Sequence, residues 1–231
     1  MIIWFSLASI PVLISIIIAW RVLANFKPYQ HFTISAPKLY LLNQPEQFST
    51  SYLLNYPYQP HGANWTIEWL IKGKQPALVM FVASEFIRSA NLSAVEIEDY
   101  AVQLNSDGTE VIQLQWSDQE SHKISDKLIT NLFQNLMLND NEKVGWQLVF
   151  NNQQLSESVI KCSLQLMITA PDISRRKQII TQIEDFLSQH SPLYNAHTDI
   201  TLVDYQKREL ASSILHLKKE QFAVLASNKI N

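Results

Sequence analysis

The sequence predicts an α+β protein in which one N-terminal transmembrane helix precedes an antiparallel sheet covered by helices. Three observations predict this fold class. Residues 1–20 contain no charged side chain. Stretches with the period-two alternation of strands are interspersed with stretches at helical spacing. Turn-forming segments join neighbouring strand-like stretches, as antiparallel pairs require. We therefore expect an anchor over residues 1–24, a proline- and aromatic-rich connector over residues 25–63, and an α+β domain over residues 64–231.

The composition argues against several function classes. Only four glycines occur among the 231 residues, so glycine-rich phosphate-binding loops are nearly excluded. The net charge of −3 at pH 7 gives no reason to expect nucleic-acid binding. One cysteine, Cys162, cannot form an internal disulfide or a cysteine-based zinc site, and its apolar neighbours predict a buried thiol. We expect no cofactor.

The anchor is predicted over residues 2–20. At 1.5 Å per residue, a helix of this length spans close to the ~30 Å hydrocarbon core of a bilayer. Trp4 and Trp20 lie near its two ends, where indole rings prefer the headgroup level. A cleaved signal peptide is the alternative, with residues 22–24 as its cleavage site. The missing cationic N-terminal region and the length of the apolar stretch favour an uncleaved anchor.

The charges beside the anchor predict its orientation. No lysine or arginine precedes the helix, whereas Arg21, Lys27 and Lys38 follow it before the first acidic residue, Glu46. The positive-inside rule therefore predicts a single-pass protein of the inner (plasma) membrane with a cytoplasmic domain. A periplasmic domain is the alternative. Arg21 and Lys27 are also expected to meet anionic lipid headgroups.

The connector contains five prolines interleaved with tyrosines and phenylalanines. Such aromatics are expected to pack onto the domain, so the connector is predicted to be an ordered extension with strands near residues 32–35 and 51–55.

The first half of the domain reads as strands and one helix. Residues 65–71 alternate as a strand that has two tryptophans and two isoleucines on one face. Residues 78–90 are predicted to be a helix, with a buried strand over residues 78–82 as the alternative. Residues 95–104 and 109–116 flank an Asp-Gly turn, which predicts a hairpin.

The second half continues the alternation of helices and strands. Helical spacing over residues 128–137 predicts a helix, and residues 146–150 and 158–169 read as a strand pair. Pro171-Asp172 predicts the start of another helix. A last strand over residues 199–205 and a C-terminal helix over residues 210–225 complete the chain. This order is compatible with two similar β-α-β halves in a ferredoxin-like arrangement.

No motif for a catalytic nucleophile, a metal or a nucleotide occurs. Glu96, Glu98 and Asp99 form an acidic cluster that could serve as an acid/base pair, although a solvated strand face has the same pattern. His190 and His197 lie in a predicted loop, where solvated histidines are the alternative to a metal site. We therefore assign no catalytic or metal-binding residue.

Two basic groups are candidate contacts for a partner or for anionic lipid. Arg175, Arg176 and Lys177 fall in the first turn of a predicted helix, where cations oppose the helix dipole. Residues placed against a local preference are candidates for function. Lys218 and Lys219, together with Lys207 and Arg208, form the second group. A solvated helix face is the alternative for both groups.

Residues 166–171, followed by a predicted helix, strand and terminal helix, are similar in order to the C-terminal half of ZipA, a family of bacterial cell-division anchors. The charge-free anchor, the cations after it and the C-terminal α+β domain also resemble that family. The long Pro/Gln-rich linker expected of the family is missing. The resemblance covers about 70 residues of pattern, so no site residue is carried over.

These observations predict a non-catalytic scaffold or adaptor that binds a protein partner in a bacterial cell-envelope assembly. Confinement beside a membrane raises the effective concentration of such a domain for its neighbours. The alternatives are a membrane-anchored hydrolase with dispersed acid/base residues, such as Glu96, Glu98 or a loop histidine, and a toxin-immunity protein.

Overall fold

The computed structural model describes residues 35–56, 63–117, 124–198, 200–211 and 214–227. All of them belong to one compact unit, Ser35–Asn231. The predicted anchor over residues 2–20 lies outside the described residues, together with Trp4, Trp20, Arg21 and Lys27. Within the described part of the chain, no helix has the length and apolar character that a membrane span requires.

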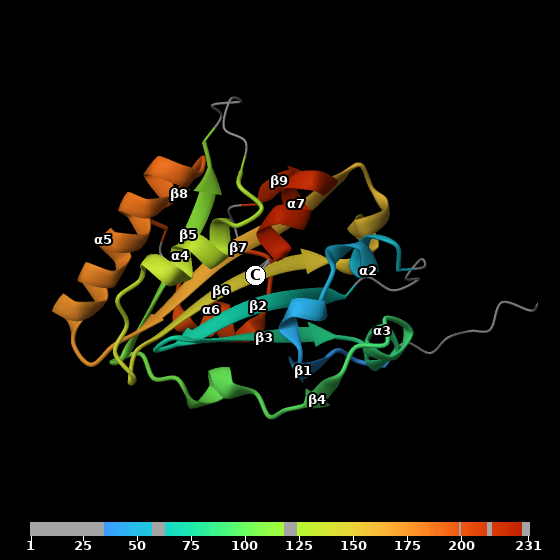
Figure 1. The fold of residues 1–231 in the computed structure, drawn as a ribbon, viewed down its shortest axis with the longest axis horizontal. Coiled ribbons are helices and arrows are strands. Elements are labelled where there is room, and N and C mark those ends of the chain that lie inside the picture. Colours follow the sequence, from blue (N-terminus) through green and yellow to red (C-terminus); the bar gives the residue numbers. More distant parts are fainter. Residues whose placement is uncertain (1–34, 57–62, 118–123, 199, 212–213, 228–231) are drawn as a thin grey trace, which may run out of the picture. The chain divides into compact units, whose positions relative to one another are not determined.

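A nine-stranded sheet in which every pair is antiparallel forms the centre of the unit, and helices cover it (Figure 1). This arrangement confirms the α+β class with an antiparallel sheet. The order of strands is β4-β1-β3-β2-β6-β7-β5-β8, and β9 pairs with β7. The strands are β1 (Lys38–Leu42), β2 (Asn64–Lys72), β3 (Gln75–Val82), β4 (Ala94–Glu96), β5 (Thr109–Trp116), β6 (Lys143–Asn151), β7 (Val159–Thr169), β8 (Leu193–Asn195) and β9 (Leu215–Lys218).

The two halves of the sheet repeat one layout. The first half runs β1, α2, β2, β3, α3, β4, and the second runs β5, α4, β6, β7, α5, β8. In each half the spatial order is fourth, first, third and second strand, and the halves meet where β2 pairs with β6. The helices are α2 (Thr50–Leu54), α3 (Ser84–Ser89), α4 (Leu128–Asn135), α5 (Ile173–His190), α6 (Leu202–Lys207) and α7 (Lys219–Ala226), with 3-10 turns η1 (Pro45–Gln47), η2 (Tyr100–Gln103) and η3 (Asn152–Ser156).

One face of the sheet, called the helix face here, contains the main core. The indole nitrogens of Trp69 and Trp146 donate to the carbonyls of Ala226 and Leu225, each at 3.1 Å, and so hold α7 on this face. The ring of Trp65 packs at 5.4 Å from Phe86 of α3. Helices α2 and α4 contact α7, and α4 contacts α5. Figure 1 shows α4 and α7 in front of the strands and α6 behind them.

The opposite face, called the α6 face here, is covered by η2, α6 and the chain beside them. Side chains alternate along a strand, so Thr66 and Glu68 of β2 point to this face, away from the tryptophans. A small apolar cluster lies here, separate from the tryptophan-rich core. Its buried members are Ala101, Val111, Met167 and Tyr205.

Several predicted elements are confirmed. The alternating stretch over residues 65–71 is β2, and the strand pair over residues 146–150 and 158–169 is β6 and β7. Helix α4 occupies most of the predicted range 128–137. The carboxylate of Asp172 accepts the amide of Arg175 at 2.7 Å and so caps α5, as the Pro-Asp start signal predicts.

Other predicted elements are wrong. Residues 78–82 belong to strand β3, the alternative, and the helix that follows begins only at Ser84. Residues 95–104 and 109–116 form no hairpin, because β4 pairs with β1 whereas β5 pairs with β7 and β8. The turn signal itself is satisfied locally, since the Asn105 side chain accepts the Gly108 amide at 2.8 Å.

Three short segments also adopt another structure than predicted. Residues 51–55 fall largely in helix α2, whose start is capped by the Ser49 hydroxyl. Most of the strand predicted over residues 199–205 is the start of α6, where Thr201 and Asp204 form a capping box. The predicted C-terminal helix is divided between β9 and α7.

Candidate functional site

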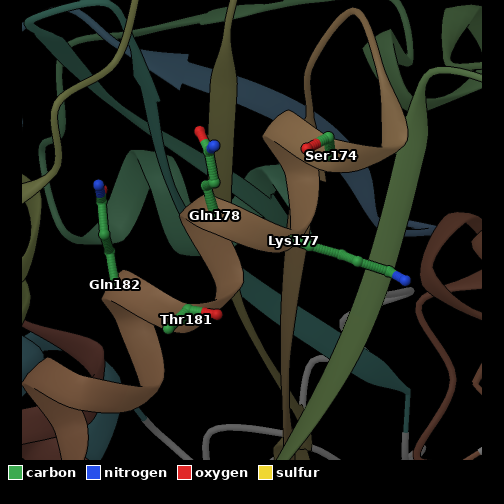
Figure 2. Close-up of a pocket in the computed structure, with 5 residues that line it drawn as sticks. All are labelled: Ser174, Lys177, Gln178, Thr181 and Gln182. Atoms are coloured by element: carbon green, nitrogen blue, oxygen red, sulfur yellow. The ribbon is translucent and has the colours of Figure 1, made fainter.

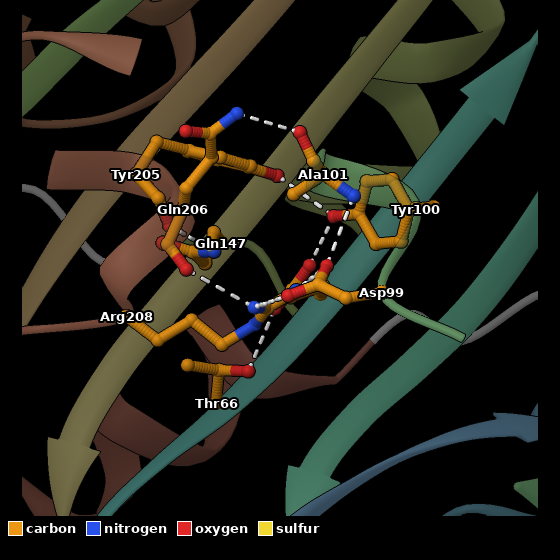
Figure 3. A network of polar contacts seen from close by, with 9 residues as sticks. Thr66, Asp99, Tyr100, Ala101, Gln147, Tyr205, Gln206 and Arg208 are labelled. Atoms are coloured by element: carbon orange, nitrogen blue, oxygen red, sulfur yellow. Dashed lines mark hydrogen bonds and ion pairs between the residues drawn. The ribbon is translucent and has the colours of Figure 1, made fainter. Parts of the chain in front are cut away.

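A buried ion-pair network joins three distant segments on the α6 face (Figure 3). Arg208, directly after α6, donates from Nε to Glu68 Oε1 at 2.8 Å. Its two terminal nitrogens donate to Asp99 Oδ2 at 2.6 Å and Oδ1 at 2.9 Å. The Arg208 side chain is 4% exposed and the Glu68 side chain is fully buried. The Arg208–Glu68 pair is costly to break, because each partner alone would be an uncompensated buried charge.

Hydroxyl groups complete the network. Thr66 Oγ1 donates to Glu68 Oε1 at 2.8 Å, and the Tyr100 hydroxyl donates to Glu68 Oε2. The hydroxyls of Tyr100 and Tyr205 are 3.1 Å apart. Burial, followed by the charge of Glu68, raises the pKa of both tyrosines well above the ordinary value, so both hydroxyls stay protonated.

The electrostatics of the network favour the charged forms of Asp99 and Arg208. Burial raises the pKa of Asp99, but the hydrogen bonds and charge of Arg208 lower it by more. Burial likewise lowers the pKa of Arg208, and the bonds to Asp99 and Glu68 more than reverse this effect. The backbone of Arg208 is left-handed, with φ of 54°. We interpret the network as a latch, because it fastens α6 and the start of η2 to β2.

A row of amides continues from Glu68 across the neighbouring strands. Glu68 of β2 is opposite Gln147 of β6, Gln147 is opposite Gln165 of β7, and Gln165 is opposite Gln113 of β5. Each of these four side chains is at most 1% exposed. Gln147 Nε2 donates to the Tyr205 carbonyl at 3.3 Å, so this row lies beneath α6.

Two exposed valines belong to the two elements that the latch joins. Val102 of η2 is 73% exposed and Val203 of α6 is 53% exposed, on two elements that contact one another. Gln206 Nε2 donates to the Ala101 carbonyl at 2.7 Å and joins these elements directly. We call this the valine surface. It presents apolar side chains on a backbone that the latch holds in place.

The structure places Arg175 in an ion pair. Its Nε and NH2 atoms donate to the two oxygens of Glu142 at 2.7 and 2.9 Å. Asn139 donates to the same carboxylate from its backbone and its side chain. The hydrogen bonds from Arg175 are the main cause that lowers the pKa of Glu142 to about 2. Arg175 therefore fastens the loop that precedes β6 to the first turn of α5.

The other two basic residues of this turn, Arg176 and Lys177, differ in burial. Arg176 is buried and donates from NH1 to the Ala170 carbonyl at 3.1 Å. Lys177 is exposed and borders a shallow polar hollow of about 410 Å³ on α5. Figure 2 shows Gln178 and Gln182 pointing to one side of the helix and Lys177 to another. The remaining residues of the hollow are Ser174 and Thr181.

The structure does not bring the two predicted basic groups together. Lys218 is opposite Val159 at the start of β7, whereas α5 follows the other end of this 11-residue strand. An extended strand of that length covers about 35 Å. Lys218 is exposed at the start of α7, and Lys219 is half-buried.

The acidic and histidine candidates are also dispersed. Glu96 bonds the exposed Lys38 at 2.8 Å, Glu98 is exposed, and Asp99 belongs to the latch. The ring of His190 lies 4.5 Å from that of Phe186. Nowhere in the described segments do three His, Cys, Asp or Glu side chains group to hold a metal ion. Cys162 is buried, and burial raises the pKa of its thiol.

Sequence reasoning missed Glu68, and it placed Arg208 in a basic group expected on a helix surface, whereas Arg208 is buried in an ion pair. Glu68 occupies the polar position of an alternating strand, which is typical of a solvated face. Arg208 follows a stretch that alternates like a strand, and nothing local distinguishes it from a surface arginine. The signal available in the sequence was a glutamate or glutamine within each of four strongly apolar stretches: Glu68, Gln113, Gln147 and Gln165. Comparisons with protein-family models, with curated proteins and with solved structures found no match.

Proposed function

We propose that this chain is a membrane-tethered, non-catalytic scaffold or adaptor whose domain binds another protein in a bacterial envelope assembly. The observation on which this rests is the valine surface. Val102 and Val203 are strongly exposed, yet they stand on elements fixed by the buried network of Arg208. Scattered exposed valines are ordinary, but apolar groups held on a preorganised backbone lose little entropy on binding.

The tether and its orientation are part of the proposal. Residues 2–20 would span the inner membrane, with Trp4, Trp20, Arg21 and Lys27 at its interfaces. The cations after this stretch support a cytoplasmic domain.

The repeated order of strands supports the finer proposal that both halves of the sheet are ferredoxin-like units. We also propose Lys177, Lys218 and Lys219 as secondary contacts for acidic groups of a partner or of lipid; nucleic acid is not proposed as a partner.

Affinity capture of the full-length protein from mild detergent tests the proposed contact. We expect a stoichiometric protein partner with the unaltered chain, and loss of that partner in Val102→Asp and Val203→Asp. Ile173→Asp is the matched control, because Ile173 is 61% exposed at the start of α5, which lies outside the valine surface. If all three variants retain the partner equally, the valine surface is not the contact.

The tether needs separate measurements. We expect detergent, and not high salt or carbonate, to release the protein from membranes. A C-terminal alkaline phosphatase fusion should be inactive in cells when the domain is cytoplasmic. An active fusion would instead assign the domain to the periplasm. Recovery of the full-length chain in the soluble fraction would contradict the membrane anchor.

A further inference from the structure

Polar side chains of the sheet find hydrogen-bond partners in α7 on the helix face, whereas several of those on the α6 face do not. Two tryptophans of the sheet donate hydrogen bonds to carbonyls at the end of α7. On the α6 face of β6 and β7, four buried polar atoms have no hydrogen-bond partner among the described residues. They are Gln147 Oε1, Gln165 Oε1, Gln165 Nε2 and Ser163 Oγ. All three side chains are fully buried and belong to the same face of β6 and β7.

These unpartnered atoms oppose closure of α6 over the sheet. A buried polar group without a partner loses its hydration and gains nothing in return. When α6 lifts, water reaches the carboxamide of Gln165 and restores both of its hydrogen bonds. The amide row therefore favours an open α6 relative to a row of apolar side chains of the same size.

A small set of side chains holds α6 in its closed position. Among residues 202–207, only Tyr205 is fully buried. The Arg208 latch, the bonds of Gln147 and Gln206, the contact between the Tyr100 and Tyr205 hydroxyls and the packing of Leu202 against the apolar cluster supply the remaining anchors. A helix of six residues has little stability of its own, because helix formation is cooperative and short helices are marginal. The left-handed backbone of Arg208 adds a further cost to the closed state.

We propose that residues 201–208 form a strap that detaches from the α6 face as a unit while β6, β7 and the helix face stay folded. Opening exposes the amide row as a polar strip across β6, β7 and β5. It also removes Val203 from the valine surface. This last consequence rests on the proposed function, whereas the opening itself does not: partner binding would then require the closed strap.

Hydrogen exchange of the full-length protein in detergent, without any partner, tests the opening. We expect amides of residues 202–207 to exchange at least about tenfold faster than those of β6 and β7. Their exchange should respond little to low urea, because a local opening exposes little surface. Equal protection and equal urea dependence in α6 and β7 would overturn the proposal.

Two variants test the physical cause. Gln165→Met keeps a side chain of similar length but removes the unpartnered amide, so α6 exchange should slow by about tenfold. Gln178→Met, on the solvated side of α5, is the matched control and should leave α6 exchange unchanged. If Gln165→Met changes α6 exchange no more than the control does, the amide row does not drive opening. The capture experiment can fail independently, and such a failure would concern the partner alone.

Discussion

Replacing Glu142 by glutamine removes one charge from a nearly enclosed ion pair. The Glu142 side chain is 1% exposed, whereas its partner Arg175 is 21% exposed. The pKa of Glu142 falls from the ordinary 4.5 to about 2, mainly because of the hydrogen bonds from Arg175. At ~1.4 kcal/mol for each tenfold change in proton affinity, this amounts to about 3 kcal/mol. Solvent around Arg175 reduces the effect, and we expect Glu142→Gln to lower the free energy of unfolding by about 2 kcal/mol at pH 7.

The pH dependence gives the sharper test. A carboxylate with a lowered folded-state pKa stabilises the fold fully above about 4.5, and its contribution is lost as the pH falls toward about 2. The difference between Glu142→Gln and the unaltered protein should therefore shrink between pH 7 and pH 3. Urea unfolding followed by tryptophan fluorescence measures it, since Trp65, Trp69 and Trp146 are fully buried.

A matched control separates burial from charge pairing. Glu96→Gln removes a similar charge from the pair with Lys38, whose two side chains are 53% and 52% exposed. Exposed pairs contribute about 0.2–1 kcal/mol, so the control should change stability little. A Glu142→Gln effect that equals the control, or that stays constant down to pH 3, would refute the reasoning.

Three other predictions follow from the packing of the α6 face. Gly145→Ala should cost about 1–3 kcal/mol in urea unfolding, because the new Cβ would lie 2.8 Å from the Tyr205 hydroxyl; unchanged stability would contradict this close contact. Arg208→Met should cost about 3–5 kcal/mol by leaving Glu68 buried and unpaired, and adding Glu68→Gln should restore part of the loss. Cys162 should resist maleimide in the native protein and react only in urea, since its thiol is buried with a raised pKa; rapid native labelling would show that β7 opens.

Local sequence signals predicted most of the long elements. The alternation in β2 and the Asp172 cap of α5 act within a few neighbours, so their pattern is readable without the fold. Short apolar stretches were ambiguous, because five or six residues fit a strand and a helix equally well. Helices α2 and α6 were therefore missed, and their capping serines and threonines were the available signal.

Pairing between distant strands was beyond local reasoning. The Asp-Gly signal predicted that β5 would pair with the strand just before it. Instead β5 pairs with β7, whose matching residues follow 50 to 60 positions later. Register of this kind depends on which faces become buried together, and turn chemistry alone does not specify it.

The sequence determined the α+β class and most of the long elements. It also identified the basic first turn of α5 as a candidate contact for a partner or for lipid. The roles of individual charges were decided by tertiary structure alone. Arg175 meets Glu142 from 33 positions away, and Arg208 meets Glu68 from 140 positions away. An arginine on a solvated surface and an arginine in a buried pair have the same local neighbours in sequence. Only the fold removes water from one of them, and the loss of water is what makes its partner indispensable.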